Sequence, residues 1–541
     1  MLTGAIELFL ISLGLTYFMA TTGAGLRVRL AAARPGPGRP GNRRQHGRHG
    51  RPRGRRAGSG PPVPEQPLLG QSVPGQSGPE QAAPGAGLLV YYLIPCLDEA
   101  AVIADTVSAL LADPRARVVV IDDASQDGTG ALAAAVSPGR VSVVHRELPG
   151  AQQGKGPALN AGYWFAVQDA ARRGIDPARI VIGVMDADGR LSPGALDAVL
   201  PLFGDPRVGG VQLPVRIRNR GSLLTAMQDI EFWGVCALAQ LGRNVCGTAS
   251  LGGNGQFTRL QALRGLGHRP WGTDLTEDLE LTLALASEGW RLVSTPDAWV
   301  SQQGVTTLTA LLRQRARWYQ GHMQAARWLP RLWRARRLSH LGMLELTLYL
   351  AVPWTLVLPW SVLFNYNLVR MVGWIAGWER RPVLGTGLLQ QVSTVLFWYA
   401  LSCVPIWLAG LYYWRQQREK GLLRSFLAGH LLLVGNYVTF AACWRALFRL
   451  LAGANGWQKT ARLTEHAVPA GGTGPAGAHR GAGRLRPRLA LAGGAHRMDA
   501  PWLTLAATGA HRGGADEAQP ARSRLKPQAG GFPRSALVTA C

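Results

Sequence analysis

The sequence predicts an α/β domain with a mostly parallel sheet, followed by α-helical transmembrane segments. Two observations lead to this prediction. Between residues 88 and 305, short apolar runs rich in β-branched residues alternate with helical patterns, which is typical of strands covered by helices on both faces. After residue 340, apolar runs reach the length that a helix needs to cross a bilayer.

The predicted strands and helices of the α/β domain alternate regularly. The strands are expected at 88–95, 117–122, 141–145 and 180–185, and the helices at 99–112, 128–136, 155–171 and 192–202. Sheets of this kind bind their ligands beyond the carboxyl ends of the strands. The pairs Asp122–Asp123 and Asp186–Asp188 follow two of these strands, so we expect the functional site at that edge.

Two low-complexity segments flank the regions of regular pattern. Residues 1–25 contain an apolar run with arginines after it, which favours an N-terminal membrane anchor, because a cleaved signal carries its positive charge before the apolar region. Residues 26–87 form an Arg/Pro/Gly linker, and residues 467–541 form a similar tail. Both are poor in aromatic and β-branched residues, so we expect them to be disordered.

These two segments carry most of the formal net charge of +26. Residues 27–56 alone hold 11 Arg and no acid. Aromatic residues do not alternate with the arginines as a nucleic-acid stacking surface requires, so no nucleic-acid partner is expected. The six cysteines show no paired metal spacing, which favours a reducing, cytosolic compartment for the catalytic domain.

The C-terminal half predicts a membrane region. Residues 306–340 are amphipathic and rich in Arg and Trp, as in helices that lie in the membrane interface. The transmembrane region is expected at 341–450, with spanning runs near 341–365, 390–414 and 425–447, and a cytosolic juxtamembrane segment at 451–466. Positive charge marks the cytosolic side of a membrane, and it lies on both sides of the last run. The number of spans after the catalytic domain is therefore expected to be between three and five. We expect a multi-pass protein of the cell membrane.

Five short motifs hold polar residues suited to binding a nucleotide-diphosphate sugar. MDADG (185–189) places two carboxylates after a strand, where they can bind a hard divalent cation, although an Asp-x-Asp pair is also a common surface turn. In VIDDASQDGT (120–129), Asp123 either faces a nucleoside or belongs to a loop with a helix cap. GKGPALNAG (154–162) begins a helix with Lys155, which could bind phosphate.

The last two motifs lie further along the chain. In TEDLELTLAL (276–285), the acids either stabilise the helix dipole or include a general base. QRARW (314–318) is explained equally well by an interfacial helix rich in Arg and Trp. Considered separately, each of these motifs has an ordinary structural explanation.

Together, the ordered motifs DD, DxD, TED and QxxRW resemble those of the membrane-integrated family 2 glycosyltransferases. The chain is similar to cellulose, hyaluronan and poly-N-acetylglucosamine synthases, and also to glucosyldiacylglycerol synthases, from about residue 88 to residue 462. The resemblance implies a Rossmann-like GT-A domain at 88–305. It also implies an inverting transfer from a UDP-sugar, with Mg²⁺ or Mn²⁺ as cofactor.

The resemblance further implies a role for each motif residue. Asp278 would be the catalytic base, and Asp186 and Asp188 would hold the metal. The donor would be bound by Pro95, Glu99, Asp123, Lys155, Asp186 and Arg317. The acceptor would be bound by Gly253, Asn254, Gln314 and Trp318. Asp98 departs from the family pattern, since relatives usually have Asn there, which makes a nucleotide contact at this position uncertain.

The acceptor is expected to be a growing β-linked polysaccharide at the membrane. The alternative within the same class is transfer of a single glucose to a lipid. Two further alternatives come from other classes, namely a non-catalytic membrane adaptor and a basic nucleic-acid-binding protein. The sequence leaves the identity of the sugar and of any partner subunits open.

Overall fold

The computed structural model describes residues 2–32, 87–378, 386–416 and 421–454. Nearly all of the predicted linker and the whole predicted tail lie outside these residues. By its contacts the chain divides into Met1–Pro469 and Ala470–Cys541, and every structural statement below concerns the first of these units.

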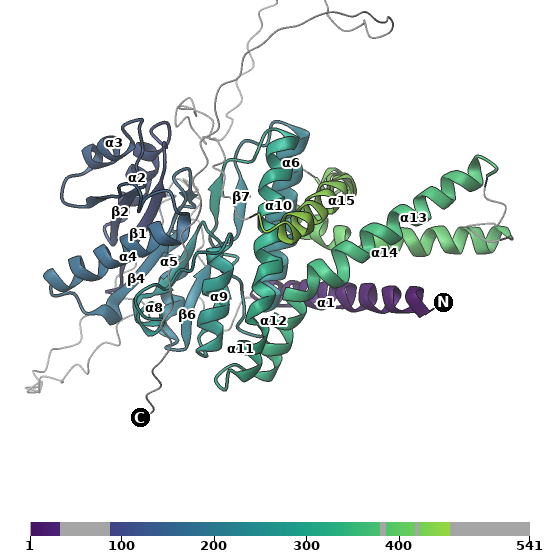
Figure 1. Ribbon diagram of the computed structural model, residues 1–541, viewed down its shortest axis with the longest axis horizontal. Coiled ribbons are helices and arrows are strands. Elements are labelled where there is room, and N and C mark those ends of the chain that lie inside the picture. Colours follow the sequence, from purple (N-terminus) through teal and green to yellow (C-terminus); the bar gives the residue numbers. More distant parts are fainter. Residues whose placement is uncertain (1, 33–86, 379–385, 417–420, 455–541) are drawn as a thin grey trace, which may run out of the picture. The chain divides into compact units, whose positions relative to one another are not determined.

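A seven-stranded sheet forms the centre of the α/β domain, in the order β3-β2-β1-β4-β8-β6-β9 (Figure 1). Its strands are β1 (Leu89–Cys96), β2 (Ala116–Asp122), β3 (Val141–His145), β4 (Ile180–Val184), β6 (Val208–Gln212), β8 (Gln256–Arg259) and β9 (Arg291–Ser294). Strand β8 is antiparallel to both of its neighbours, and the other strand pairs are parallel. The predicted mostly parallel α/β sheet is therefore confirmed.

Side chains of β1 alternate between two hydrophobic cores, one on each face of the sheet. Tyr92 and Ile94 belong to the first core, and Tyr91 and Leu93 belong to the second. Helices α2 (Ile103–Leu111), α3 (Thr129–Val136) and α5 (Ala195–Val199) contribute to the first core, and α4 (Lys155–Arg172), α8 (Leu260–Gly265) and α9 (Glu277–Ser287) to the second. Burial on both faces explains why these strands are almost continuously apolar.

A second, three-stranded sheet has the order β5-β10-β7. Its strands are β5 (Arg190–Leu191), β7 (Val215–Ile217) and β10 (Val300–Gln302). Strand β5 directly follows the DxD segment, and β10 directly precedes Gln303, which contacts Asp188. The small sheet therefore supports one side of the predicted site.

Four helices, with short irregular turns between them, connect the α/β domain to the predicted membrane region. Helices α6 (Leu223–Ile230) and α7 (Ala237–Arg243) are joined by a π-helical turn, η3 (Glu231–Cys236). Helix α10 (Leu308–Gln324) carries the QxxRW motif and is followed by η4 (Ala325–Trp328) and α11 (Leu329–Arg334). The α6 helix starts with a capping box, in which Ser222 and Thr225 satisfy each other's backbone N–H groups.

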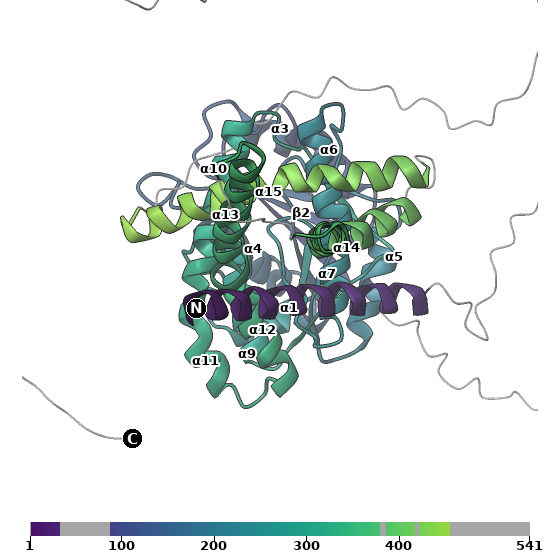
Figure 2. The same ribbon diagram turned by 90° about the vertical axis from the view of Figure 1, so that its right-hand side faces the viewer.

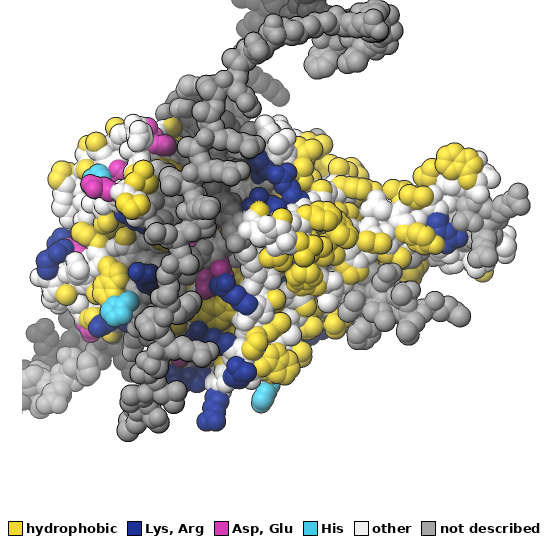
Figure 3. Space-filling view, viewed as in Figure 1, with side chains coloured by type: hydrophobic (Ala, Val, Ile, Leu, Met, Phe, Trp, Pro, Cys, Tyr) yellow, Lys and Arg dark blue, Asp and Glu magenta, His cyan; other side chains and the backbone are white. Residues whose placement is uncertain are grey.

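The long apolar helices are α12 (His340–Val352), α13 (Leu358–Ile375), α14 (Leu388–Gln416) and α15 (Leu422–Leu451). Within the described residues, two helical segments are long and apolar enough to cross a membrane, His340–Ile375 and Ser425–Leu451. Hydrophobic side chains crowd the surface over α13, α14 and α15 in Figure 3. Figure 2 shows that α15 runs crosswise to α13. The number of spans stays a prediction.

Two features of the long helices sharpen the predicted boundaries. Pro353 begins a π-helical turn, η5 (Pro353–Val357), between α12 and α13, because proline cannot donate the regular helical hydrogen bond. Helix α1 (Leu2–Ala32) continues seven residues past the predicted end of the anchor at residue 25. Its last turns are held by Arg29, which contacts Asp297 at 3.4 Å and the side chain of Gln416 at 3.3 Å.

Candidate active site

The predicted site residues outside the QxxRW motif lie along one edge of the main sheet because of the strand directions. Strands β1, β2 and β4 are parallel, so the segments that follow them all leave at the same edge. Strand β8 runs the other way, so it begins where β4 ends, and Gln256 pairs with Val184. The loop at 252–255, which holds the predicted acceptor residues Gly253 and Asn254, therefore meets the DxD segment.

Lys155 is at the centre of this edge. Its ammonium donates to Asp186 Oδ1 at 2.6 Å and to the carbonyl oxygen of Gly253 at 2.6 Å. A cation at the N-terminus of α4 opposes the helix dipole, so the local fold alone does not favour a lysine here. Burial by itself lowers the pKa of Lys155, but the nearby carboxylates of Asp186, Glu277 and Asp278 outweigh it and raise that pKa, which keeps the side chain charged.

The loop at 252–255 is held by side chains rather than by regular structure. Gln212 accepts from the backbone N–H of Gly252 at 2.7 Å and donates to the carbonyl oxygen of Asn254 at 2.9 Å. The side chain of Asn254 donates to Gln302 at 2.9 Å and accepts from the backbone N–H of Asp186 at 3.2 Å. These bonds fix the loop directly against the DxD motif.

Asp186 and Asp188 lie in different surroundings. The side chain of Asp186 is 25% exposed and faces Lys155. Asp188 is buried, and its Oδ2 accepts from the backbone N–H of Gln303 at 2.8 Å. Among the residues that the structure describes, no three His, Cys, Asp or Glu side chains form a cation site on their own. A metal held by these two carboxylates would take its further ligands from phosphate oxygens, and its presence stays a prediction.

Glu277 and Asp278 form an acidic pair at the first turn of α9, in which Glu277 is buried and Asp278 is half-buried. Burial raises the pKa of both carboxyl groups, and the charge of Lys155 acts in the opposite direction on each. Asp278 also accepts hydrogen bonds from the backbone N–H groups of Leu279, at 2.8 Å, and Gly253. Only Asp278 of this pair was predicted as a site residue, although Glu277 stands beside it in the same motif.

Asp123 lies on the β2 side of the same edge. It forms an ion pair with Arg146 and accepts from the backbone N–H of Gln152 at 3.0 Å. Burial raises the pKa of this carboxyl group, and the bond from Gln152 and the charge of Arg146 oppose the rise. Arg146 was not predicted as a site residue, because a single arginine in the loop after β3 has no sequence pattern that marks it.

Pro95 and Glu99 lie at and just after the end of β1. Pro95 pairs in register with Ile121 of β2. Glu99 is buried, and its backbone N–H donates to the Thr129 hydroxyl at 2.8 Å. Next to them, the Asp98 carboxylate accepts from the backbone N–H of Gln126 at 2.8 Å. The structure thus gives Asp98 a role in joining two loops.

Helix α10 brings only part of the QxxRW motif to the acids. The positive charge of Arg317 lowers the pKa of Glu277, so these two side chains are near one another. Trp318 packs edge-on against Phe232 and lies under the guanidinium of Arg315, whose carbon is 4.3 Å from the ring centre. Gln314 is half-buried, one turn earlier on the helix.

A mostly parallel sheet with acids, a lysine and a glycine loop at its carboxyl edge is typical of the α/β enzymes that bind nucleotides. Residues 86–321 match the family model described as "Glycosyltransferase like family 2". This part of the chain therefore matches the family that the motifs resemble, and the resemblance is confirmed.

Known relatives of the chain synthesise glycolipids and polysaccharides. Over 290 residues it is 33% identical to the beta-monoglucosyldiacylglycerol synthase of Synechocystis sp., covering 50% of this chain and 57% of that protein. It is 29% identical to the poly-beta-1,6-N-acetyl-D-glucosamine synthase of Staphylococcus aureus, covering 43% and 54%. The chain thus spans little more than half the length of these curated relatives.

Among solved structures, the mannosyltransferase PcManGT from Pyrobaculum calidifontis, in complex with GDP-Man and Mn²⁺, is similar to this chain. The TM-score is 0.45 and the sequence identity is 16%, with 82% of this chain and 99% of that chain covered.

Proposed function

We propose that this protein is an inverting, metal-dependent hexosyltransferase that moves a sugar from a UDP-sugar to an acceptor at the membrane. The observation that carries the proposal is the contact of Lys155 with both Asp186 and the Gly253 carbonyl, next to the acidic pair Glu277 and Asp278. The ammonium of Lys155 thus lies between the DxD segment, which is suited to binding a metal and a diphosphate, and the acidic pair, which is suited to supply a base.

The proposed reaction is a single displacement. An acceptor hydroxyl attacks the anomeric carbon of the donor sugar, the bond from that carbon to the β-phosphate oxygen breaks, and UDP leaves. Asp278 takes the proton of the attacking hydroxyl, and the raised pKa of the acidic pair suits it to accept a proton near neutral pH. Lys155 and Arg317 place positive charge beside the departing diphosphate, where opposite charge is most effective.

The remaining predicted residues bind and orient the two substrates. Asp123 would contact the nucleoside, together with Pro95 and Glu99 at the end of the neighbouring strand. Gly253, Asn254, Gln314 and Trp318 would face the acceptor. Asp186 and Asp188 offer the hard carboxylate oxygens that Mg²⁺ and Mn²⁺ prefer, and the bound metal would neutralise charge on the diphosphate.

We propose two candidate acceptors, each supported by one of the relatives. A growing β-linked polysaccharide is the acceptor predicted from the motifs, and a polysaccharide synthase is among the relatives. Transfer of one glucose to a lipid is favoured by the glucosyldiacylglycerol synthase relative, which has the higher identity of the two. Either acceptor suits a protein of the cell membrane whose catalytic domain faces the cytosol.

The activity is tested with the full chain purified in detergent. UDP release from a panel of UDP-sugars is measured with Mg²⁺, with Mn²⁺ and with a chelator. We expect metal-dependent release by the wild type and its loss in Asp278→Asn. The control is Asp197→Asn, because that exposed acid pairs only at the surface with Arg115. Turnover by Asp278→Asn equal to that of the wild type would exclude Asp278 as the base.

The acceptor is decided by the product formed from a radiolabelled donor. A product that migrates with glycolipids on a lipid chromatogram indicates a lipid acceptor, and one that stays at the origin indicates a polymer. Digestion of the retained product by a β-specific glycosidase then checks the inverted linkage.

A further inference from the structure

A buried ion pair joins the candidate membrane helix α12 to the α/β domain. Arg243, the last residue of α7, contacts Glu345 of α12 through Nε and Oε1 at 2.8 Å and through Nη2 and Oε2 at 3.3 Å. Both side chains are almost completely buried. Acids inside apolar helices are costly, and they are usually held by a partner with a defined purpose.

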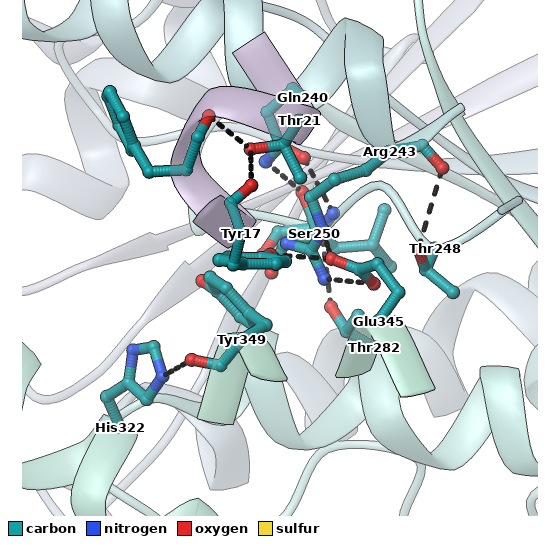
Figure 4. Close-up of polar contacts among 12 residues, drawn as sticks. Tyr17, Thr21, Gln240, Arg243, Thr248, Ser250, Thr282, His322, Glu345 and Tyr349 are labelled. Atoms are coloured by element: carbon teal, nitrogen blue, oxygen red, sulfur yellow. Dashed lines mark hydrogen bonds and ion pairs between the residues drawn. The ribbon is translucent and has the colours of Figure 1, made fainter. Parts of the chain in front are cut away.

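Two tyrosines complete this cluster, as Figure 4 shows. Tyr17 of α1 donates its hydroxyl to Glu345 Oε1 at 2.7 Å. Tyr349 stands four residues after Glu345, on the same face of α12, and its ring lies 3.9 Å from the guanidinium carbon of Arg243. The cluster Tyr17, Arg243, Glu345 and Tyr349, called here the helix clamp, thus connects α1, α7 and α12.

The helix clamp continues into the loop that carries Gly253. The Tyr349 hydroxyl lies beside the side chain of Ser250. The side chain of Gln240, also on α7, holds the backbone of Ser250 with two hydrogen bonds. It accepts from the Ser250 N–H at 2.8 Å and donates to the Ser250 carbonyl oxygen at 2.7 Å. The ring of Tyr349 also packs against the ring of His322, with 4.7 Å between the ring centres. His322 lies on α10, the helix that carries Arg317.

From Ser250 the contacts lead directly to the acidic pair. The next residue, Leu251, donates its N–H to the Thr282 hydroxyl at 2.9 Å, and that hydroxyl donates to the Asp278 carbonyl at 2.8 Å. The far end of the loop is held separately, since Asn254 is fixed by Gln212 and Gln302. The helix clamp therefore acts on the end of the loop next to Asp278 and not on the end next to the DxD motif.

We infer that Arg243, Glu345 and Tyr349 are positioning residues, through which the helices α1 and α12 set the place of Ser250 and of the start of α9 for sugar transfer. The inference rests on the proposed function for its catalytic consequence. Its structural part, the ordering of residues 249–252 by the helix clamp, does not depend on any activity.

The test compares Tyr349→Phe and Glu345→Gln with Tyr413→Phe in the full chain. Tyr349→Phe keeps the ring beside Arg243 and removes only the hydroxyl that lies beside Ser250. Tyr413→Phe is a matched control, because Tyr413 of α14 also bonds a buried acid of the α/β domain, Asp229, at 2.8 Å. That bond joins α14 to α6 and does not involve residues 249–252.

Two kinds of measurement are made on each variant. The first is amide hydrogen exchange at residues 249–252, and the second is function, measured as kcat in steady-state kinetics and as the Kd for UDP. We expect Tyr349→Phe and Glu345→Gln to exchange at least about ten-fold faster there and to lose about ten-fold in kcat, with the Kd for UDP within about two-fold of wild type. The control should match the wild type in both. Replacing both Arg243 and Glu345 by Gln should cost no more than the larger single effect, since the two act as a pair.

The outcomes separate the two proposals. Unchanged exchange at 249–252 in both variants, or an equal change in the control, overturns the positioning role whatever the activity. A wild type that binds no UDP and releases none from any UDP-sugar overturns the proposed function, while faster exchange in Tyr349→Phe would still support the clamp. Accelerated exchange with an unchanged kcat in an active enzyme would overturn the catalytic part of the inference.

Discussion

The ammonium of Lys155 lies 2.6 Å from a carboxylate oxygen of Asp186, although 31 residues separate the two along the chain. The contact joins the start of α4 to the end of β4 and explains a lysine where the helix dipole favours an acid. It also leaves the positive charge next to the acids of α9. The position therefore suits a residue that binds an anionic donor.

We predict that Lys155→Gln weakens binding of the UDP-sugar. Loss of one charge-assisted hydrogen bond to a diphosphate should raise KM for the donor by about ten- to hundred-fold. Arg173→Gln is the control, because Arg173 follows the opposite end of the same helix, where it pairs with Asp169 at 2.8 Å. Equal donor KM values for Lys155→Gln and the wild type would remove Lys155 from the donor site.

The acidic pair predicts the pH dependence of the transfer. A base must be ionised to accept a proton, and burial raises the pKa of both Glu277 and Asp278. Activity should therefore fall as the pH drops through this raised value, above the ordinary carboxyl pKa of about 4. The measured value belongs to the pair, because the two groups interact. It is obtained from kcat/KM between about pH 5 and about pH 9.

Glu277→Gln tests how strongly the two neighbouring charges interact. Removing one of two neighbouring negative charges makes the other easier to ionise, so the acid limb of the profile should move to lower pH. An unchanged limb would show that the charge of Glu277 does not contribute to the observed pKa. The variant should still release UDP, since Asp278 remains in place.

The same elements show what the sequence could and could not predict. The ends of β1, β2 and β4 were expected within one residue of their observed places, because strands buried on both faces are unbroken apolar runs followed by polar turns. The four-residue strand β8 was not foreseen, since its length and mixed pattern carry no clear signal. Its antiparallel direction is what brings Gly253 to Lys155.

Contacts between distant residues account for most of what the motifs left out. Glu277 was visible in the TED motif, but only its burial beside Lys155 makes it part of a pair. Tyr17 and Glu345 are 328 residues apart, and no local pattern connects them. Propensity and periodicity describe neighbours along the chain, whereas such contacts arise from the packing of whole helices.

A methyl group at Gly253 should disturb Lys155. A Cβ at this position would lie 2.8 Å from the lysine Nζ, closer than a carbon and an ammonium can approach. We predict that Gly253→Ala lowers UDP release by about ten-fold or more, through displacement of the ammonium from Asp186. Gly221→Ala serves as the control, because a Cβ there meets no atom within 4 Å. Wild-type turnover by Gly253→Ala would contradict the close approach.

The crossing of α1 and α7 predicts a difference between two glycines of α1. A Cβ at Gly25 would lie 1.9 Å from the carbonyl oxygen of Leu238, and one at Gly242 would lie 1.8 Å from that of Thr21. A Cβ at Gly23, only two residues away on the same helix, would meet no atom within 4 Å. The backbones of the two helices therefore touch at Gly25 and Gly242, as small residues allow.

Gly25→Ala should accordingly destabilise the protein, and Gly23→Ala should not. Both changes gain the same intrinsic helix propensity, about 1 kcal/mol, so the difference between them isolates the clash, which typically costs about 1–3 kcal/mol. The measurement is the thermal unfolding midpoint in one detergent, followed by tryptophan fluorescence. If both variants unfold at the same temperature, α1 does not pack against α7 through these glycines. The connection from α1 through the helix clamp to residues 249–252 would then depend on Tyr17 alone.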